Sequence, residues 1–273
     1  MNHETEPAAA RASNRPVPGG REGTAGREHE AELSAYLQSF VARNGSTFHH
    51  VLRRPAETFR AGRDLLALPV LTVTVGRSAE GAAIRHEFSR FTTRRWLLGL
   101  SAVLEIPQDP EQYRAGSSKQ TLRRKARAAQ AKGVTWRPIN DVDERRHLLE
   151  LANLHELMNE REQYRQEQPE NDDLLDHRLW LLASSADGVP LLLSVTPYDG
   201  EWASLRYFRT LSSEPAASDA RYWMTDVLVE HLSALGVRHL IDAAVPHWLP
   251  NGLRHFQRMV GFRLVRLRFP REP

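Results

Sequence analysis

Cysteine is absent from the 273 residues of this chain, and so are long apolar runs. Without cysteine, disulfides, thiolate metal sites and thiol nucleophiles are excluded. No apolar stretch approaches the roughly 20 residues that a membrane-spanning helix needs, and the N-terminus lacks the apolar segment of a secretory signal. Residues 1–27 are rich in Ala, Gly, Pro and Arg without periodicity, so we expect a disordered tail and a cytoplasmic protein.

Acidic residues are missing from Gln112–Asn140, which carries eight Lys or Arg. The next segment, Asp141–Asp176, has the opposite balance, with twelve acids against four Arg. The formal net charge of +3 therefore hides a separation of charge along the chain. Two interpretations stay open: the two segments neutralise each other in the fold, or the basic segment faces an anionic ligand.

The basic segment predicts one helix over residues 117–133, with a serine cap at its start and Gly133 at its end. Lys119, Arg123 and Arg127 are four residues apart, so they share one face. Like charges at this spacing destabilise a helix by roughly a few tenths of a kcal/mol per pair, a penalty that a polyanion such as phosphate would remove. A thin apolar stripe is expected to hold the helix down: Leu122, Ala126 and Ala129.

The first half of the chain predicts a small α+β part over residues 28–111. Glu28–Asn44 has apolar residues at helical spacing. Strands are expected at Thr47–Leu52, Val70–Val75, Ala82–Phe91 and Trp96–Ile106. The stretch Ser78-Ala79-Glu80-Gly81 is interpreted as a turn. This part indicates no function by itself.

The second half predicts a longer series of elements. After a strand at Val134–Ile139, Asp141 caps a long helix. The expected buried side of that helix is Leu148, Leu149, Leu151, Ala152, Leu154, His155 and Met158. A short helix over 174–178 and strands over 179–184, 189–196 and 202–209 follow, the strands separated by the hairpin signals Asp187-Gly188 and Asp199-Gly200. The remaining elements are a helix over 219–235, a strand over 238–243, a helix over 252–260 and a strand over 262–269.

This order resembles the GNAT acyltransferase fold over about Val134–Phe269, in the branch related to FemABX peptidyltransferases. The basic helix is similar to the Ser-x-Lys-x-x-Arg-Arg pattern of that branch, which ends in Lys-Gly; the matching residues are Ser117, Lys119, Arg123, Arg124, Lys132 and Gly133. Leu235–Asp242 resembles its element of helix, Gly and strand ending in Asp, and Gly252–Phe262 resembles its closing segment. The fold class expected is α/β (α+β): a mixed, mostly antiparallel sheet flanked by helices, with residues 112–133 as the basic helix and 134–273 as the transferase domain.

The loop after the fourth strand of this domain departs from the CoA-dependent enzymes of the fold. Those enzymes have a glycine-rich loop there, which holds the CoA pyrophosphate at a helix N-terminus. Residues 210–219 contain no glycine, Pro215 lacks an N–H donor, and Glu214 and Asp219 would repel phosphate. FemABX-like enzymes lack the loop too, and many take their acyl group from aminoacyl-tRNA. The resemblance therefore favours aminoacyl-tRNA over acyl-CoA as donor.

The reaction implied is attack of an amine on an ester or thioester carbonyl. It needs an oxyanion donor and a route for one proton, but no metal and no tightly bound cofactor. The resemblance places the oxyanion donor among the backbone N–H groups of Tyr207–Thr210. Candidate catalytic residues are Asp242, Glu156, Glu160, His155 and Tyr207, with His247 as a further proton carrier. The alternative for Glu156 and Glu160, one turn apart on the expected helix, is a solvated acidic face, and for Tyr207 it is a core aromatic.

Contacts to donor phosphate or tRNA are expected from cations. The candidates are Lys119, Arg123, Arg124, Lys125, Arg127, Lys132, Arg209, Arg254 and Arg258. The lysine of the closing FemABX segment is replaced by Gln257, and Arg258 follows it. We expect an acyltransferase that forms an amide bond on a small or nucleotide-linked amine, with tRNA as a partner. An acyl-CoA-dependent N-acyltransferase with a divergent phosphate loop and a non-catalytic RNA-binding relative remain the alternatives.

Overall fold

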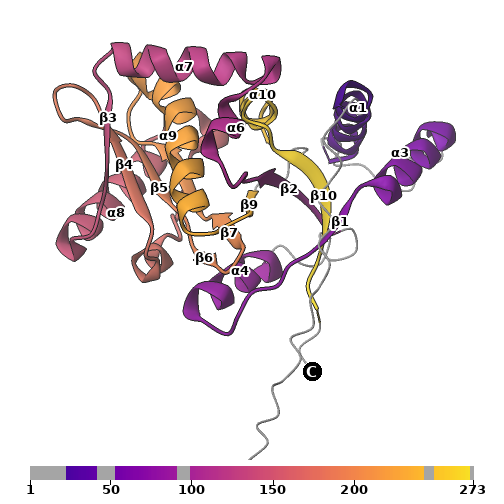
Figure 1. Ribbon diagram of the computed structural model, residues 1–273, viewed down its shortest axis with the longest axis horizontal. Coiled ribbons are helices and arrows are strands. Elements are labelled where there is room, and N and C mark those ends of the chain that lie inside the picture. The colour runs from indigo at the N-terminus through magenta and orange to yellow at the C-terminus, as the bar shows by residue number, and fades with distance from the viewer. Residues whose placement is uncertain (1–22, 42–52, 91–98, 243–248, 271–273) are drawn as a thin grey trace, which may run out of the picture.

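The computed structural model describes residues 23–41, 53–90, 99–242 and 249–270. These residues form a mixed α+β fold with two sheets (Figure 1). The first sheet has the order β1-β10-β2-β9-β7-β6 and the second the order β3-β4-β5-β8. The predicted fold class, mixed α+β with a mostly antiparallel sheet flanked by helices, is confirmed.

The bounds of the elements are as follows. The strands are β1 (Val70–Thr72), β2 (Leu100–Glu105), β3 (Thr135–Pro138), β4 (Trp180–Ser184), β5 (Pro190–Val195), β6 (Tyr198–Asp199), β7 (Trp202–Leu205), β8 (Tyr207–Thr210), β9 (His239–Asp242) and β10 (Arg263–Arg268). The helices are α1 (Gly23–Val41), α3 (Pro55–Ala67), α4 (Ala79–Arg90), α6 (Pro110–Arg114), α7 (Gln120–Ala131), α8 (Val142–Leu157), α9 (Pro215–Ala234) and α10 (Asn251–Val260). Three short 3-10 helices are η1 (Ser117–Lys119), η2 (Glu162–Tyr164) and η3 (Asp172–Asp176).

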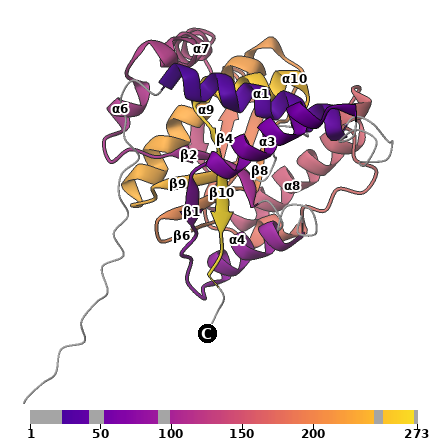
Figure 2. The same cartoon turned by 90° about the vertical axis from the view of Figure 1, so that its right-hand side faces the viewer.

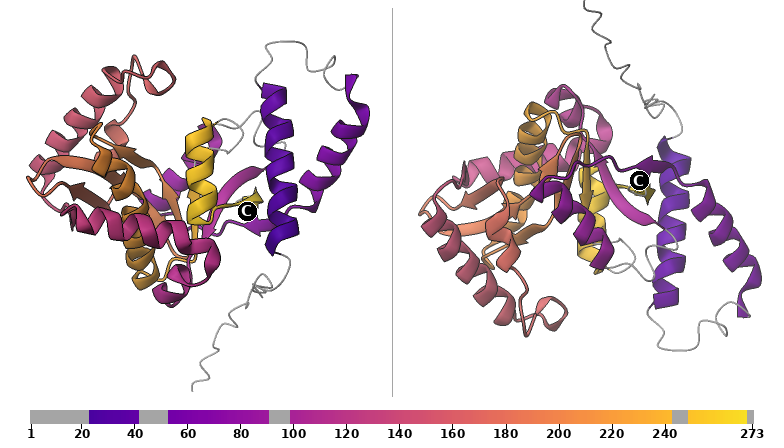
Figure 3. Two further views of the ribbon diagram at one scale, coloured as in Figure 1. Left: turned by 90° about the horizontal axis from the view of Figure 1, so that it is seen from above. Right: turned by 90° about the horizontal axis from the view of Figure 1, so that it is seen from below.

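Helices cover both faces of each sheet (Figures 1, 2 and 3). One core packs α7 and α9 against the sheets and includes Leu122, Leu228 and Leu240. On the opposite face of the second sheet, α8 packs over Trp180 and Leu193. The helix α4 packs on the first sheet, and α1 and α3 cover its outer end near β10. Burial of these apolar faces supplies the main stabilisation of the fold.

The first sheet brings together strands from the first half of the chain and strands from near its end. β1 runs parallel to β10, with Val70 opposite Arg266, and β2 runs antiparallel to β9, with Ala102 opposite Asp242. Strands from residues 28–111 therefore complete the sheet that holds β9 and β10. In the described residues, no helix combines the length and the apolar character that crossing a membrane requires.

The chain passes from the first sheet to the second at Arg206, and we call residues 205–207 the sheet switch. Leu205 on β7 lies opposite Asp242 on β9, whereas Tyr207 on β8 lies opposite Val195 on β5. The prediction of one strand over 202–209 is therefore wrong: it consists of two strands in different sheets. The residue between them is Arg206, whose side chain is held by distant acidic residues described below.

The prediction of a strand over residues 82–91 is wrong, because residues 82–90 belong to α4. The hydroxyl of Ser78 accepts a hydrogen bond from the N–H of Gly81 at 2.9 Å, so it caps the helix. Ile84 and Phe88, four residues apart, are buried on one face of α4. The stretch interpreted as a turn is thus a helix start. The helix α3 was not predicted either.

Several other predictions have a definite outcome. The cap at Asp141 is confirmed, since its carboxylate accepts from the N–H of Glu144 at 2.8 Å. Leu148, Leu149 and Ala152 are buried as expected, but Leu154 and Met158 are exposed. Gly23–Arg27, predicted as part of the disordered tail, begin α1, while residues 1–22 and the predicted strand Thr47–Leu52 lie outside the described residues.

The basic segment is not one continuous α-helix. It consists of η1 and then α7, and neither start has a side-chain cap, so the predicted serine cap is wrong. Gly133 does end it, with a φ of +72° that favours glycine. The predicted apolar stripe is confirmed, because Leu122, Ala126 and Ala129 are all buried.

Candidate active site

The edge of β8 lies open beside the sheet switch. β8 is the last strand of the second sheet in the described part of the chain. The N–H of Leu211 donates to the carbonyl of Leu191 at 2.9 Å, and Arg209 lies opposite Leu193. Because hydrogen-bonded and non-bonded pairs alternate in an antiparallel ladder, the backbone groups of Phe208 and Thr210 point to the open edge. Two N–H donors are thereby available beside Arg206.

A buried ion pair lies on the α8 side of this edge. Glu156, in the last turn of α8, is 2% exposed, and its carboxylate is 2.8 Å from the guanidinium of Arg209, which is 44% exposed. Asn171 donates to the same carboxylate at 3.3 Å. In the amide orientation that satisfies both partners, Gln166 donates to Glu156 and accepts from Arg209, each at 3.2 Å. Glu156 is therefore not part of a solvated acidic face.

Tyr207 and His155 adjoin this pair. Burial raises the pKa of Tyr207, and the carboxylate of Glu156 acts in the same direction, so the phenol stays protonated at neutral pH. Burial lowers the pKa of His155, and Arg209 adds to that effect against the opposing influence of Glu156. A half-buried imidazole that is neutral at pH 7 is suited to accept a proton.

Two other candidate proton carriers are placed differently. Glu160 was expected one turn from Glu156 on the same helix, but α8 ends at Leu157 and Glu160 is exposed beyond it. The expectation that the two carboxylates share a helix face is therefore wrong. His247 lies outside the described residues.

Asp242 ends β9 on the other side of the sheet switch. Its carboxylate accepts a hydrogen bond from the amide of Gln257 at 2.5 Å. Gln257 lies on α10 and is 3% exposed. Gln257 thus contacts Asp242, a predicted catalytic residue, directly, which the sequence did not indicate.

Arg221 on α9 was not among the predicted residues. Its guanidinium carbon lies 5.6 Å from the ring centroid of Phe256, whose ring stacks with Phe208 on β8 at 6.2 Å. Burial lowers the pKa of Arg221, and Arg209 is among the charges that lower it further. The signal available in the sequence was an arginine between the apolar Ala220 and the aromatic Tyr222 in the expected helix 219–235.

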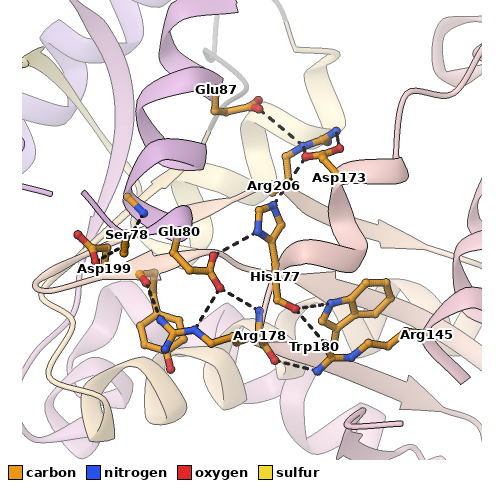
Figure 4. Close-up of polar contacts among 12 residues, drawn as sticks. Ser78, Glu80, Glu87, Arg145, Asp173, His177, Arg178, Trp180, Asp199 and Arg206 are labelled. Atoms are coloured by element: carbon orange, nitrogen blue, oxygen red, sulfur yellow. Dashed lines mark hydrogen bonds and ion pairs between the residues drawn. The ribbon is translucent and has the colours of Figure 1, made fainter. Parts of the chain in front are cut away.

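A second group of charged residues holds the sheet switch in place, and the sequence did not predict it (Figure 4). We call Glu80, Glu87, Asp173, His177, Arg178 and Arg206 the His177 cluster. The guanidinium of Arg206 donates to Asp173 at 2.7 and 2.8 Å, and Glu87 of α4 lies 3.7 Å away. Arg206 is therefore fixed from η3 and from α4, and this fixes the point where the strands separate.

His177 joins the two halves of the cluster. Its ring nitrogens lie 3.2 Å from Glu80 and 3.7 Å from Asp173. Burial alone would lower the pKa of His177, but Asp173 and Glu80 outweigh it and raise the pKa to about 9. Burial alone would likewise raise the pKa of Glu80, but hydrogen bonds from His177 and Arg178 lower it. The cluster also borders a cavity of about 270 Å³.

Most cations of the basic segment have hydrogen-bond or ion-pair partners within the fold. Lys119 donates to the carbonyl of Val260 and lies 3.9 Å from the ring centroid of Tyr113, while Arg123 donates to Gly116 at 2.8 Å. The expected row of outward-facing cations is therefore wrong for these two residues. Arg127 is exposed as expected, and so is Arg124.

Lys125 and Lys132 are occupied by an acid from α9. Their ammonium groups lie 2.6 and 2.7 Å from the two carboxylate oxygens of Asp219, which is 4% exposed. Asp219 is thereby neutralised, so the expectation that it repels phosphate is wrong. Acids of α9 pair with three cations of the basic segment, Arg114, Lys125 and Lys132. The acidic segment 141–176 contributes the pair of Arg137 with Glu144.

Arg254 and Arg258 line a groove between α1 and α10. Its volume is about 490 Å³, and Arg263, Gln257 and Glu30 also line it. Arg254 donates to the side chains of Gln38 and Asn251, and Arg263 pairs with Glu30. Since Gln257 contacts both the groove and Asp242, the groove adjoins the sheet switch.

Comparisons with known proteins give a distant structural likeness. No family model matches the sequence, and no curated protein matches it. Among solved structures, L-PGS from Bacillus licheniformis is similar, with 16% sequence identity and a TM-score of 0.45 over 61% of this chain. So is the C-terminal domain (DUF2156) of a protein assigned as a lysylphosphatidylglycerol synthetase from Agrobacterium fabrum, with 16% identity and a TM-score of 0.44 over 61% of this chain. The matched region spans 57% of each of those chains, and a likeness of this degree carries no activity over to this chain.

The arrangement around β8 has the parts that acyl transfer requires. It offers backbone N–H groups at an open strand edge, a neutral imidazole, and guanidinium groups on both faces of the strand. Electrostatic stabilisation of an oxyanion and removal of one proton are the two tasks in such a reaction. In the described ranges, no group of three or more His, Asp or Glu is arranged to hold a metal ion.

Proposed function

We propose that this protein is an acyltransferase that forms an amide bond on an amine acceptor, with aminoacyl-tRNA as donor. The observation that carries the proposal is the open edge of β8, with Arg209 on one face and Arg221 on the other. We also propose membership of the GNAT-like, FemABX-related branch, on the residues of the basic segment and of the closing segment.

The proposed reaction uses groups at that edge. The amine nitrogen attacks the ester carbonyl of the donor, the C–N bond forms, and the C–O bond to the leaving hydroxyl breaks. The N–H of Phe208 or Thr210 donates to the oxyanion, and removal of one such donor typically costs a factor of about 10² to 10³ in rate. His155 accepts the proton that the amine loses, and the leaving oxygen takes up a proton.

A tRNA donor is supported by cations that remain accessible on adjoining elements. Arg124 and Arg127 are exposed on α7, and neither is in an ion pair within the described part of the chain. Arg254 and Arg258 line the groove beside α10. Phosphate contacts of this kind give binding that weakens steeply with salt.

Acyl-CoA is the second candidate donor, and one observation favours it. Asp219 holds two lysines beside the first turns of α9, which leaves one positive charge near a helix N-terminus. A phosphate at that end would be stabilised although the loop before it has no glycine. A non-catalytic RNA-binding protein is the third possibility.

The test is to offer both donors to the full chain. The protein is incubated with a mixture of amine metabolites and either charged total tRNA or acyl-CoA, and the products are identified by mass spectrometry. An amide product that forms with charged tRNA supports the proposal. A product that forms with acyl-CoA alone overturns the tRNA donor, and retention of tRNA without any product overturns the enzymatic activity.

A further inference from the structure

Arg221 is a half-buried cation that no carboxylate contacts directly in the described residues. In the described part of the chain, its guanidinium makes no hydrogen bond and no ion pair. Its contact is with the aromatic ring of Phe256, 5.6 Å from the guanidinium carbon to the ring centroid. A cation over an aromatic face gains roughly 0.5–2 kcal/mol, which offsets only part of the cost of removing a guanidinium from water.

The helix that carries Arg221 offers it no acid. The residues one turn away on either side are Ala217, Ser218, Met224 and Thr225. The acids of α9 point the other way: Asp219 holds Lys125 and Lys132, while Asp226 and Glu230 hold Arg114. Unlike these three acids, Arg221 forms no ion pair within the described residues.

The surroundings of Arg221 belong to the sheet switch. Phe256, over which it lies, stacks with Phe208 of β8, and the charges that influence its pKa include those of Arg209 and Asp242. Of the two neighbouring acids, Glu156 pairs with Arg209, and Asp242 accepts from the neutral amide of Gln257. Asp242 therefore acts on Arg221 as a nearby negative charge but forms no ion pair with it.

We propose that Arg221 binds a singly charged oxyanion group of a substrate beside the open edge of β8. A guanidinium presents two parallel N–H donors that match the two oxygens of a phosphodiester or a carboxylate, and no ion pair occupies these donors of Arg221 within the described residues. This inference rests on the proposed function: a phosphodiester there belongs to the 3′ end of the tRNA donor, and a carboxylate belongs to the acceptor. Arg221 thus positions a substrate.

The test measures anion binding by the full chain without any turnover. Melting temperatures are recorded in dimethyl phosphate, in sodium acetate and in sodium chloride at equal ionic strength. The wild type is compared with Arg221→Met, Arg221→Lys and the matched control Arg146→Met, which removes an exposed arginine from α8. Dimethyl phosphate stands for the phosphodiester and acetate for the carboxylate.

We expect one of the two oxyanions to raise the melting temperature of the wild type and of Arg146→Met by about 1–3 °C over chloride. The same anion should give no rise in Arg221→Met and a smaller rise in Arg221→Lys, which keeps the charge but not the fork. Without the anion, Arg221→Met should melt no lower than the wild type. If Arg221→Met fails to fold, the wild type is compared with Arg221→Lys by phosphorus NMR instead. The wild type should then broaden the phosphorus resonance of dimethyl phosphate, and Arg221→Lys should not.

Equal rises in the wild type and in Arg221→Met, or no rise with either oxyanion, would overturn the site. The outcome is independent of the activity. An anion effect that depends on Arg221, found in a protein that transfers no acyl group, keeps the site and rejects the enzyme. Amide formation that is unchanged in Arg221→Met keeps the enzyme and rejects the site.

Discussion

Glu156 and Arg209 form an ion pair, 2.8 Å from carboxylate to guanidinium, in which the acid is buried and the base reaches solvent. The pair connects the end of α8 to β8. A buried carboxylate needs its partner more than an exposed guanidinium does, because only the carboxylate has lost its hydration. The two halves of the pair therefore have unequal consequences when they are removed.

Arg209→Met should destabilise the protein by about 2–3 kcal/mol, the low end for a broken buried pair because Arg209 is partly exposed. The double variant Glu156→Gln with Arg209→Met should recover a large part of that loss. Urea unfolding monitored by tryptophan fluorescence measures both. Arg137→Met is the control: it breaks an exposed pair with Glu144 and should cost less than about 1 kcal/mol. Equal losses in Arg209→Met and Arg137→Met would contradict the account of the site.

The cations of α7 should separate into two classes. Lys125→Gln with Lys132→Gln leaves Asp219 buried without a cation, so the free energy of unfolding should fall by about 2–4 kcal/mol. Arg124→Gln with Arg127→Gln should change it by less than about 0.5 kcal/mol. Retention of tRNA should show the opposite dependence: the double lysine variant should keep it, and the double arginine variant should weaken it. In the double arginine variant, the slope of log K for tRNA binding against log salt concentration should decrease in magnitude by about 2.

The matched control for tRNA retention is Arg146→Gln, which removes an exposed arginine from α8 on the other side of the second sheet. It should leave the salt slope unchanged. If the double arginine variant binds tRNA as well as the wild type does, α7 is not the docking surface.

The stability of the protein should decrease between about pH 6.5 and pH 9 because of His177. The pKa of His177 is raised to about 9 from an ordinary value of 6.5, so the folded state binds the proton more tightly than the unfolded state does. The stabilisation is complete below pH 6.5 and is lost as the pH rises through 9, a total on the order of 3 kcal/mol.

Urea unfolding at a series of pH values gives this slope. His177→Gln should lower the stability at pH 6 and flatten the decrease, whereas the control His147→Gln, an exposed residue on α8, should leave it as in the wild type. A slope that persists in His177→Gln would assign the titration to another group.

Local patterns predicted most of the second half of the fold. Asp141 caps α8, Gly133 ends α7, and Asp187-Gly188 separates β4 from β5, as expected. Asp199-Gly200 joins β7 to β6, a short strand that was not predicted, rather than to β5. These features depend on residues within one turn or one hairpin. The sequence patterns did not predict the helix α4, because Ser78 was interpreted as part of a turn. Two helix signals were nevertheless present: a serine at the cap position, and Ile84 and Phe88 four residues apart.

The features that sequence patterns missed depend on distant partners. Asp173 and Glu87 hold Arg206 at the point where the predicted strand divides into β7 and β8. Asp219 forms ion pairs with Lys125 and Lys132, so these lysines do not face solvent as free cations. Charge spacing along a helix shows which cations share a face but not which acid from elsewhere meets them. For the same reason, a single unpaired arginine such as Arg221 could be found only after every other partner was assigned.

The most direct test of acyl transfer follows a labelled amino acid from tRNA into product. Total tRNA charged with radiolabelled amino acids is incubated with the full chain and a mixture of amine metabolites, and the mixture is then treated with mild base, which cleaves esters but leaves amides intact. We predict that label moves from tRNA into a small, base-stable product with the wild type, and that Arg209→Met lowers the rate by at least about tenfold. Label that stays on tRNA, or that appears only as free amino acid, would contradict the proposed function.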